Sequence, residues 1–569
     1  MFGLTRKTRV EGMRAACLLV AAAMMLPLLS LPSHAADNPG VDFYLSSNKD
    51  DPHAVDVMLS FKLDSGETAV LKPPEQCNVE DGGSGEITID LPVLQNPEFR
   101  IEALESPDTG WVVTAVEPGE VSVPYRVSYS SAKSPQNAAE APGAPVPPRA
   151  IADQDLKAFK GSDLFICPRS GEDGSFPAKE YAVVISLESQ EKALTPWENA
   201  GDEGSFSVEG STPLLENMVC WGRIDISTLK KGNPRIVAGF SEGYRKLTGD
   251  EKGAYGDNLV SLYDEMAGIL GARPELERLT VLFAGAGRFG LTEPASMGLL
   301  DSMAVFHGGG KLEGTAAAAA ARGLFGLWNR WALVPAPESE ASWFQQGLPW
   351  FYPYRCAGQA GLLDADLAFK EFSGVHAAYL TNPLSLSTSL MEAESEGDSA
   401  VFVAGKGAVL CAAIARRLFD ESDGKKDIDW LLGEISGKFD HFQGKDYELV
   451  DITELCEEAT GKSWDRFFTE RVRGEEVIGA NEFSATDLFG TTTSAGGPKE
   501  LNQEGSSTSW IYLLVAAAVI LMIPVIFSAY VKRSINLDVR MPKILPDDDE
   551  EDDVGDSEDV PTDDGSASD

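Results

Sequence analysis

The chain has 569 residues, 43% of them hydrophobic, and a formal net charge of −42 at pH 7. Its length is enough for two or three domains, each with a buried core. The negative charge argues against nucleic acid as a partner, because a polyanion is repelled where no basic patch compensates. The sequence has no cluster of Lys and Arg with interleaved aromatic residues, so we expect no nucleic-acid partner.

Residues 1–35 predict a secretory signal peptide. Arg6, Lys7 and Arg9 precede a short apolar run, and small residues lie just before Ala36, at the usual cleavage position. The rest of the chain is therefore expected to be exported.

Six cysteines remain after removal of the signal peptide, and an exported chain can form disulfides. Cys77 and Cys167 share the predicted β region, whereas Cys411 and Cys456 lie in neighbouring predicted helices. We predict these as the two candidate pairs, and the sequence leaves the full connectivity open.

Residues 37–200 predict a β-sheet domain. Segments such as VDVMLSFKL and WVVTAV alternate or run apolar between Gly, Pro and Asp turns, which is typical of strands. We expect an antiparallel β-sandwich-like fold. Residues 134–150, rich in Pro and Ala, predict an extended surface loop.

Residues 201–484 predict a mainly helical domain, with an α+β fold for the whole exported part. Segments such as GDNLVSLYDEMAGILG and DITELCEEATG have helical periodicity, with Asp or Ser starts and Gly stops. GAGRFG at 285–290 matches the dinucleotide-binding pattern GxGxxG, but Thr-Glu-Pro follows two residues later instead of a helix. We expect a turn there.

The C-terminal residues predict a membrane anchor. A Ser/Thr/Gly-rich stalk at 485–509 precedes 22 uncharged residues at 510–531, which span roughly 33 Å as a helix. Lys532 and Arg533 follow, so the positive-inside rule places the C-terminus in the cytoplasm. We expect a single-pass protein of the plasma (inner) membrane, with a periplasmic or extracellular domain.

Residues 532–569 predict a disordered cytoplasmic tail, because their acidic run cannot bury enough surface to fold. Two roles are open for the tail: a solvated spacer, or a segment that binds a basic cytoplasmic partner.

Several motifs lie in the order found in one group of peptidases: GGGKLEG at 308–314, RGLFGLWN at 322–329, WFQQG at 343–347 and AGKG at 404–407. They resemble the edge-strand, HExxHxWN, WFxEG and YxKG motifs of the glycyl aminopeptidases, a family of gluzincin zinc metallopeptidases. Two later segments, DIDWLLGEISGKF and SWDRFFTERVRG, resemble that family's C-terminal helices. The resemblance implies a thermolysin-like peptidase domain for residues 201–484.

The same resemblance implies that the peptidase chemistry is lost. The family's two zinc-binding histidines, general base, third zinc ligand and catalytic tyrosine correspond to Arg322, Gly326, Gly323, Gln346 and Ala404. The histidine of the edge-strand motif corresponds to Gly314. Catalytic zinc needs three protein ligands and an open position for water. We therefore expect neither a zinc cofactor nor catalytic residues.

A peptidase-shaped cleft can hold an extended peptide by β-strand addition without a metal. The resemblance implies that Glu313, Arg322, Trp343 and Gln346 line this cleft. The cation of Arg322 could fill the place of the metal or receive a carboxylate. The favoured function is a membrane-anchored, exported pseudopeptidase that binds or scaffolds peptides or proteins without cleaving them.

Two other functions stay open. The chain could be an active, aminopeptidase-like metallopeptidase with an unrecognised site, because fold and chemistry can separate. It could also be a structural envelope or membrane-assembly protein that acts through its acidic tail. Zinc analysis separates the first alternative from the pseudopeptidase, and deletion of residues 547–569 tests the second.

Overall fold

The computed structural model describes residues 40–73, 78–79, 87–90, 99–104, 110–129, 150–170, 178–244, 246–271, 273, 276–289, 291–337, 339–395 and 399–484. The predicted signal peptide, stalk, membrane helix and acidic tail lie outside these residues, as do Cys77 and nearly all of the Pro/Ala-rich loop. No helix among the described residues is long and apolar enough to span a membrane.

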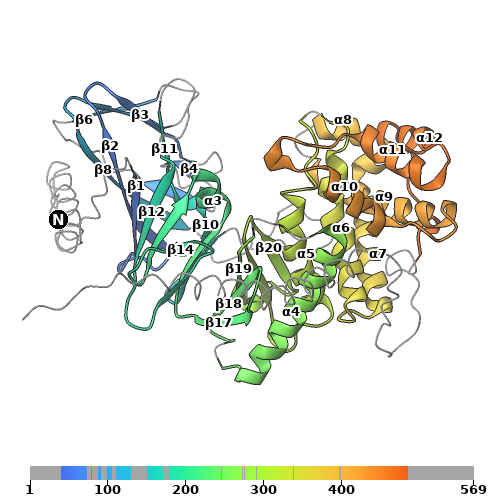
Figure 1. Cartoon of the computed structure of the whole chain (residues 1–569), viewed down its shortest axis with the longest axis horizontal. Coiled ribbons are helices and arrows are strands. Elements are labelled where there is room, and N and C mark those ends of the chain that lie inside the picture. The colour runs from blue at the N-terminus through green and yellow to red at the C-terminus, as the bar shows by residue number, and fades with distance from the viewer. Residues whose placement is uncertain are drawn as a thin grey trace, which may run out of the picture. The chain divides into compact units, whose positions relative to one another are not determined.

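The N-terminal region is built from three sheets (Figure 1). The largest has the strand order β14-β15-β12-β1-β2-β8-β5-β4, and the smaller ones have the orders β13-β16-β10-β9 and β11-β3-β7-β6. The strands are β1 Val41–Ser47, β2 Ala54–Leu63, β3 Thr68–Leu71, β4 Asn78–Val79, β5 Ile87–Asp90, β6 Phe99–Ala103, β7 Trp111–Ala115, β8 Gly119–Tyr129, β9 Ala150–Ala152, β10 Leu156–Lys160, β11 Pro168–Ser170, β12 Glu180–Ser186, β13 Lys192–Leu194, β14 Glu198–Asn199, β15 Ser205–Glu209 and β16 Met218–Gly222, with short helices α2 Gly161–Leu164 and α3 Ser211–Glu216.

Strand β8 shows why this region folds as sheets. Its side chains alternate between buried and more exposed positions from Val121 to Tyr129, as a strand with one face on a core requires. The buried residues join one hydrophobic cluster with those of β1, β2 and β12.

Two features differ from the expected antiparallel domain of residues 37–200. Strands β1 and β12 pair in parallel, with Val41 opposite Tyr181, so the large sheet is mixed. Strand β16 pairs with β10, which carries the β region to Gly222. Both differences arise from pairing between distant segments, which local periodicity does not encode.

A five-stranded sheet opens the next region, which the sequence predicted as mainly helical. Its order is β17-β18-β19-β21-β20, with three parallel strands inside and antiparallel strands at both edges. Helix α4 (Gly249–Leu270) is the crossover between β18 and β19. The strands are β17 Asp225–Lys230, β18 Arg235–Phe240, β19 Arg278–Gly285, β20 Ala295–Gly298 and β21 Ser302–His307.

The GAGRFG segment does not form a dinucleotide-binding turn. Residues Ala286–Phe289 form a short 3-10 helix after β19, and the chain then enters the edge strand β20. An α-helix in that place is what the dinucleotide fingerprint needs.

The remaining described chain is helical (Figure 1). Its helices are α5 Thr315–Asn329, α6 Ser342–Gln359, α7 Ala365–Thr381, α8 Leu390–Ser395, α9 Ala400–Glu421, α10 Ile428–Lys438, α11 Leu449–Thr460 and α12 Asp465–Phe468, followed by a π-helical turn at Thr469–Arg473. Short 3-10 turns lie at Pro383–Leu386, His441–Gln443 and Ala480–Glu482.

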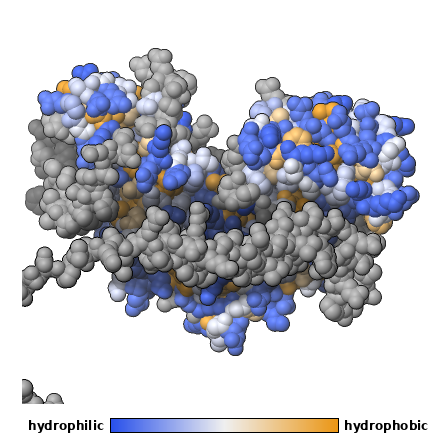
Figure 2. Space-filling view, viewed as in Figure 1, coloured by the Kyte–Doolittle hydropathy of each residue, from blue (hydrophilic) through white to orange (hydrophobic). Residues whose placement is uncertain are grey.

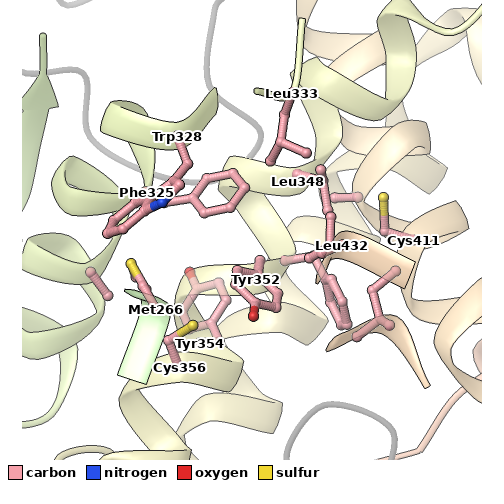
Figure 3. Packing of buried hydrophobic residues seen from close by; sticks show 14 of the residues in the cluster. Met266, Phe325, Trp328, Leu333, Leu348, Tyr352, Tyr354, Cys356, Cys411 and Leu432 are labelled. Atoms are coloured by element: carbon pink, nitrogen blue, oxygen red, sulfur yellow. The ribbon is translucent and has the colours of Figure 1, made fainter. Parts of the chain in front are cut away.

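The core of this region forms where helices α4, α5, α6, α9 and α10 meet the five-stranded sheet. Phe325 and Trp328 of α5 are fully buried there with Tyr352 of α6, and the rings of Phe325 and Tyr352 are 5.3 Å apart (Figure 3). These aromatic residues of the peptidase-like motifs therefore serve packing. By contrast, the visible surface over the C-terminal helices is mainly hydrophilic, with isolated hydrophobic spots (Figure 2).

Candidate functional site

The peptidase-like positions lie on the antiparallel helices α5 and α6. At one end of the pair the Asn329 side chain donates to the Gln345 carbonyl at 3.1 Å, and Gln345 donates back to the Asn329 carbonyl at 2.9 Å. At the other end Arg322 donates from Nε to the Pro349 carbonyl at 3.0 Å. Arg322 and Gly326 keep part of their surface exposed, and Gln346 is exposed.

Two prolines inside α6 leave backbone carbonyls that Arg322 and Asn329 of α5 satisfy. Pro349 and Pro353 lack the N–H that would bond to the carbonyl four residues earlier, so the carbonyls of Gln345 and Pro349 are left free. These are the two carbonyls to which Asn329 and Arg322 donate. Side-chain hydrogen bonds from α5 thus replace two backbone hydrogen bonds that α6 lacks, and they join the two helices.

Arg322 also has aromatic neighbours that the sequence did not single out. Its guanidinium carbon lies 4.3 Å from the ring centre of Trp350 and 5.8 Å from that of Tyr354, and Nη2 is 3.4 Å from the Tyr354 hydroxyl. The run LPWFYPYR carried a readable signal for this, because Trp350 and Tyr354 are four residues apart and share a helix face.

The positions of the general base and the second histidine pack against strands. A Cβ atom on Gly323 would lie 2.6 Å from Met303 Cε and 3.2 Å from Ser296 Cβ. One on Gly326 would lie 3.2 Å from Gly298 Cα. Gly298 itself approaches the helix so closely that its own Cβ would be 2.2 Å from the Gly323 carbonyl oxygen. Side chains at these two positions would therefore crowd strand β20 and, at Gly323, also Met303 of β21.

The edge strand is not where the motif comparison placed it. GGGKLEG forms the loop before α5, and Gly314 is the residue that caps this helix. The edge strand next to α5 is β20, Ala295–Gly298, at the end of the five-stranded sheet. The prediction for Gly314 was wrong because a run of glycines resembles a motif without forming a strand.

Two of the predicted cleft residues do not lie with Arg322. Trp343 is fully buried, and its ring packs against Phe344 and Phe468 at 5.6 and 6.4 Å. Glu313 is exposed in the loop before α5, 3.5 Å from Lys311, whereas Arg322 is seven residues, roughly 10 Å, beyond the start of this helix. Arg322 and Gln346 remain as candidates, on facing helices.

The donor set does not fit zinc. The three ligand positions present a guanidinium, a glycine and a neutral amide, and Zn²⁺ is bound by Cys, His, Asp and Glu side chains. Within the described residues, no group of three or more His, Cys, Asp or Glu side chains is arranged to hold a metal ion. Ala404, which the resemblance aligns with the catalytic tyrosine, is buried in α9 and carries only a methyl group.

The predicted disulfide between Cys411 and Cys456 is absent: both are free thiols buried in the core. Burial raises the pKa of both thiols, so they stay protonated and the reactive thiolate form is not populated. Cys167 is also a free, buried thiol, and burial raises its pKa to about 12. The predicted pairing of Cys167 with Cys77, which itself lies outside the described residues, was therefore wrong, because the Cys167 thiol is free.

Lys406, in the AGKG segment, is a buried cation that the sequence comparison did not highlight. It is fully buried, its Nζ lies 3.3 Å from the Gly474 carbonyl, and the Phe402 ring centre is 5.7 Å away. Burial lowers the pKa of Lys406 to about 8, although Glu475 and Glu476 oppose this shift. Folding therefore shifts Lys406 toward the neutral amine, but at pH 7 it is still mostly protonated, so a charge is buried there.

We expect the substitution Lys406→Met to stabilise the protein at neutral pH. The unfolded lysine titrates near 10.5 and the folded one near 8, so the unfolded chain binds more protons between these values. Stability is thus lost as the pH falls from 10.5 to 8, by up to about 3 kcal/mol. Methionine removes this loss, which outweighs the single hydrogen bond to Gly474.

Urea unfolding of the full-length chain at pH 7 and pH 10 measures this effect. The stability gain of Lys406→Met should be largest at pH 7 and shrink at pH 10. Lys438→Met, at a lysine whose side chain is 48% exposed beside Glu434, is the matched control and should change little. Equal pH dependence of wild type and Lys406→Met would contradict the expectation.

Comparison with solved structures identifies proteins that share the fold of this chain. No protein-family model matches the sequence, and no curated protein matches it. Among solved structures, an aminopeptidase N family protein from Idiomarina loihiensis matches with a TM-score of 0.59 at 13% identity, over 77% of each chain. An M1 zinc metallopeptidase from Deinococcus radiodurans has a TM-score of 0.46 at 13% identity, over 79% of this chain and 96% of its own. Yeast LTA4 hydrolase has a TM-score of 0.45 at 12% identity, over 80% of this chain and 72% of its own.

At sequence identities of 12–13%, the structural likeness shows the fold and nothing about activity. The likeness confirms the predicted peptidase-like architecture, a sheet region followed by a helical one, and does not single out the glycyl aminopeptidases. The chain therefore has the fold of the aminopeptidase N family protein that it matches.

Proposed function

We propose that this chain is a membrane-anchored, exported pseudopeptidase that binds or scaffolds peptides or proteins without cleaving them. The observation that carries the proposal is the packing of β20 against α5, where Gly298 approaches the backbone at Gly323 and Gly326. An active gluzincin needs a glutamate and a histidine at these two helix positions. In this chain β20, with Met303 of β21, crowds both positions, which supports the proposal.

The chemistry of the remaining positions supports the same proposal. Hydrolysis of a peptide bond needs an activated water and a donor for the developing oxyanion. Arg322 and Gln346 supply no metal ligand, and Ala404 supplies no hydroxyl. What remains on this face is a cation, an amide and partly exposed Trp350, which are groups that bind.

The anchoring and the cellular location rest on the sequence. Residues 1–35 and 510–531 predict export and one membrane span, and the acidic tail is proposed to lie in the cytoplasm, free to meet a basic partner.

We expect the purified full-length chain to retain well under one equivalent of zinc after incubation with excess zinc and desalting. It should also leave short peptides with small N-terminal residues intact. Elemental analysis and mass spectrometry of the peptides measure both, with an active zinc aminopeptidase carried through the same steps as the control. Stoichiometric zinc, or cleavage that a chelator abolishes, would instead favour the active-metallopeptidase alternative.

A further inference from the structure

We propose that the ligand of the α5–α6 face is recognised through a carboxylate group, bound by the guanidinium of Arg322. We define the α5–α6 face as Arg322, Gly326, Gln346, Trp350 and Tyr354. The carboxylate is the free C-terminus of a peptide or the side chain of Asp or Glu. This inference rests on the proposed peptide-binding function and specifies what that function recognises.

The first observation is the set of donors that Arg322 leaves over. Nε bonds to the Pro349 carbonyl and Nη2 is 3.4 Å from the Tyr354 hydroxyl. A guanidinium has five N–H donors, so these two contacts leave donors on Nη1 and Nη2 at the end of the fork. A carboxylate accepts two parallel bonds from that end.

The second observation is the missing counter-ion. The chain has 89 Asp and Glu against 47 Lys and Arg. Arg330, the C-cap of α5, is 3.1 Å from Glu216, and Arg355 of α6 is 2.5 Å from Asp427 and Asp429. In the described part of the chain, by contrast, no carboxylate oxygen lies within ion-pair distance of Arg322. A cation that has no carboxylate partner among the described residues of so acidic a protein is suited to an anion from outside.

The third observation is that Arg322 is held in place before any ligand arrives. The hydrogen bond from Nε to the Pro349 carbonyl fixes the orientation of the Arg322 side chain, and the Trp350 ring centre lies 4.3 Å from the guanidinium carbon. A stacked guanidinium loses little freedom when it binds, which favours affinity. Lysine could not reproduce this planar stacking.

Gln346 extends the face to a second group of the ligand. It lies one helical turn from Trp350, so their Cβ atoms are about 6 Å apart. Its amide is exposed, with a contact of 3.4 Å to the Ser342 hydroxyl. An amide at this spacing can bond to the backbone of a peptide whose carboxylate lies at Arg322.

The test uses the immobilised full-length chain and three synthetic libraries of N-acetylated tetrapeptides, with retained peptides counted by mass spectrometry. The first library lacks Asp and Glu and has a free C-terminus. The second is the same library with a C-terminal amide. The third is amidated and carries one Glu. The variants are Arg322→Gln and, as the matched control at the C-cap of the same helix, Arg330→Gln.

We expect a library with a carboxylate to be retained at least about tenfold more than the amidated one. The first and third libraries then separate a C-terminal carboxylate from a side-chain one. Arg322→Gln should abolish the preference and Arg330→Gln should keep it. Because the library comparison uses wild-type protein, it stands even if Arg322→Gln fails to fold.

Equal retention of all three libraries overturns the inference, while the peptide-binding function stands. Arg322 would then serve only to join α5 to α6 through its contacts with Pro349 and Trp350. Retention of none of the libraries overturns both.

Discussion

Replacing Arg355 with alanine should lower the free energy of unfolding by about 3–5 kcal/mol, the largest single effect we expect from loss of a polar group. Arg355 is only 2% exposed. It donates from Nε to Asp429 at 2.7 Å and from Nη2 to Asp429 and Asp427 at 2.5 Å each. Gln359 donates to Asp429 as well, at 2.9 Å.

The position of the two carboxylates makes this arginine important for the helical region. Asp427 caps the N-terminus of α10 and Asp429 lies in its first turn, so Arg355 ties α6 to the start of α10. Alanine would leave two partly buried carboxylates without their counter-ion, and such an unpaired charge is the main cost of breaking a buried pair.

Urea unfolding of the full-length Arg355→Ala variant measures the loss. Arg416→Ala is the control, since Arg416 forms an exposed pair with Asp420 four residues later in α9. That pair should contribute at most about 0.5 kcal/mol. If the losses in unfolding free energy of the two variants differ by less than about 1 kcal/mol, the ion pairs of Arg355 do not stabilise the contact between α6 and α10 as we expect.

Replacing Gly347 with alanine should destabilise the protein by about 3 kcal/mol or more. A Cβ at Gly347 would lie 2.2 Å from the carbonyl carbon of Gly407 and 2.4 Å from the Ala408 nitrogen. These are backbone atoms of α9, which a rotamer change cannot move aside. Helices α6 and α9 would have to separate, and the loss of packing along both exceeds the gain in helix propensity.

Gly374→Ala is the matched control. Gly374 lies inside α7, and nothing is within 4 Å of the Cβ that alanine would add. In an open helical position alanine is favoured over glycine by about 0.5–1 kcal/mol, so this variant should gain stability. The same substitution thus has opposite signs at the two sites. A gain at Gly347 in urea unfolding would show that α6 and α9 can part without loss.

Local signals in the sequence predicted many of the elements. Gly461 ends α11 in the left-handed conformation that glycine favours, at the Gly stop that the sequence predicted. The start of α4 was missed: the helix begins at Gly249, after the capping box of Thr248 and Glu251, ahead of the predicted segment GDNLVSLYDEMAGILG. The absence of zinc-binding side chains at Arg322, Gly326 and Gln346 was also readable, because it depends on residue identity alone. Pairings such as Val41 with Tyr181 were not, because they join residues that are far apart in the chain.

The candidate site shows the same division. The sequence by itself determined which residues stand at the peptidase-like positions, with Arg322 and Gln346 among the predicted cleft residues. Trp343 and Trp350 are seven residues apart and so lie on nearly the same side of that helix. Trp343 is nevertheless fully buried under Phe468, whereas Trp350 stays partly exposed beside Arg322. Only the tertiary structure decided between them, because burial depends on what the distant α12 covers, and helical periodicity does not carry that information.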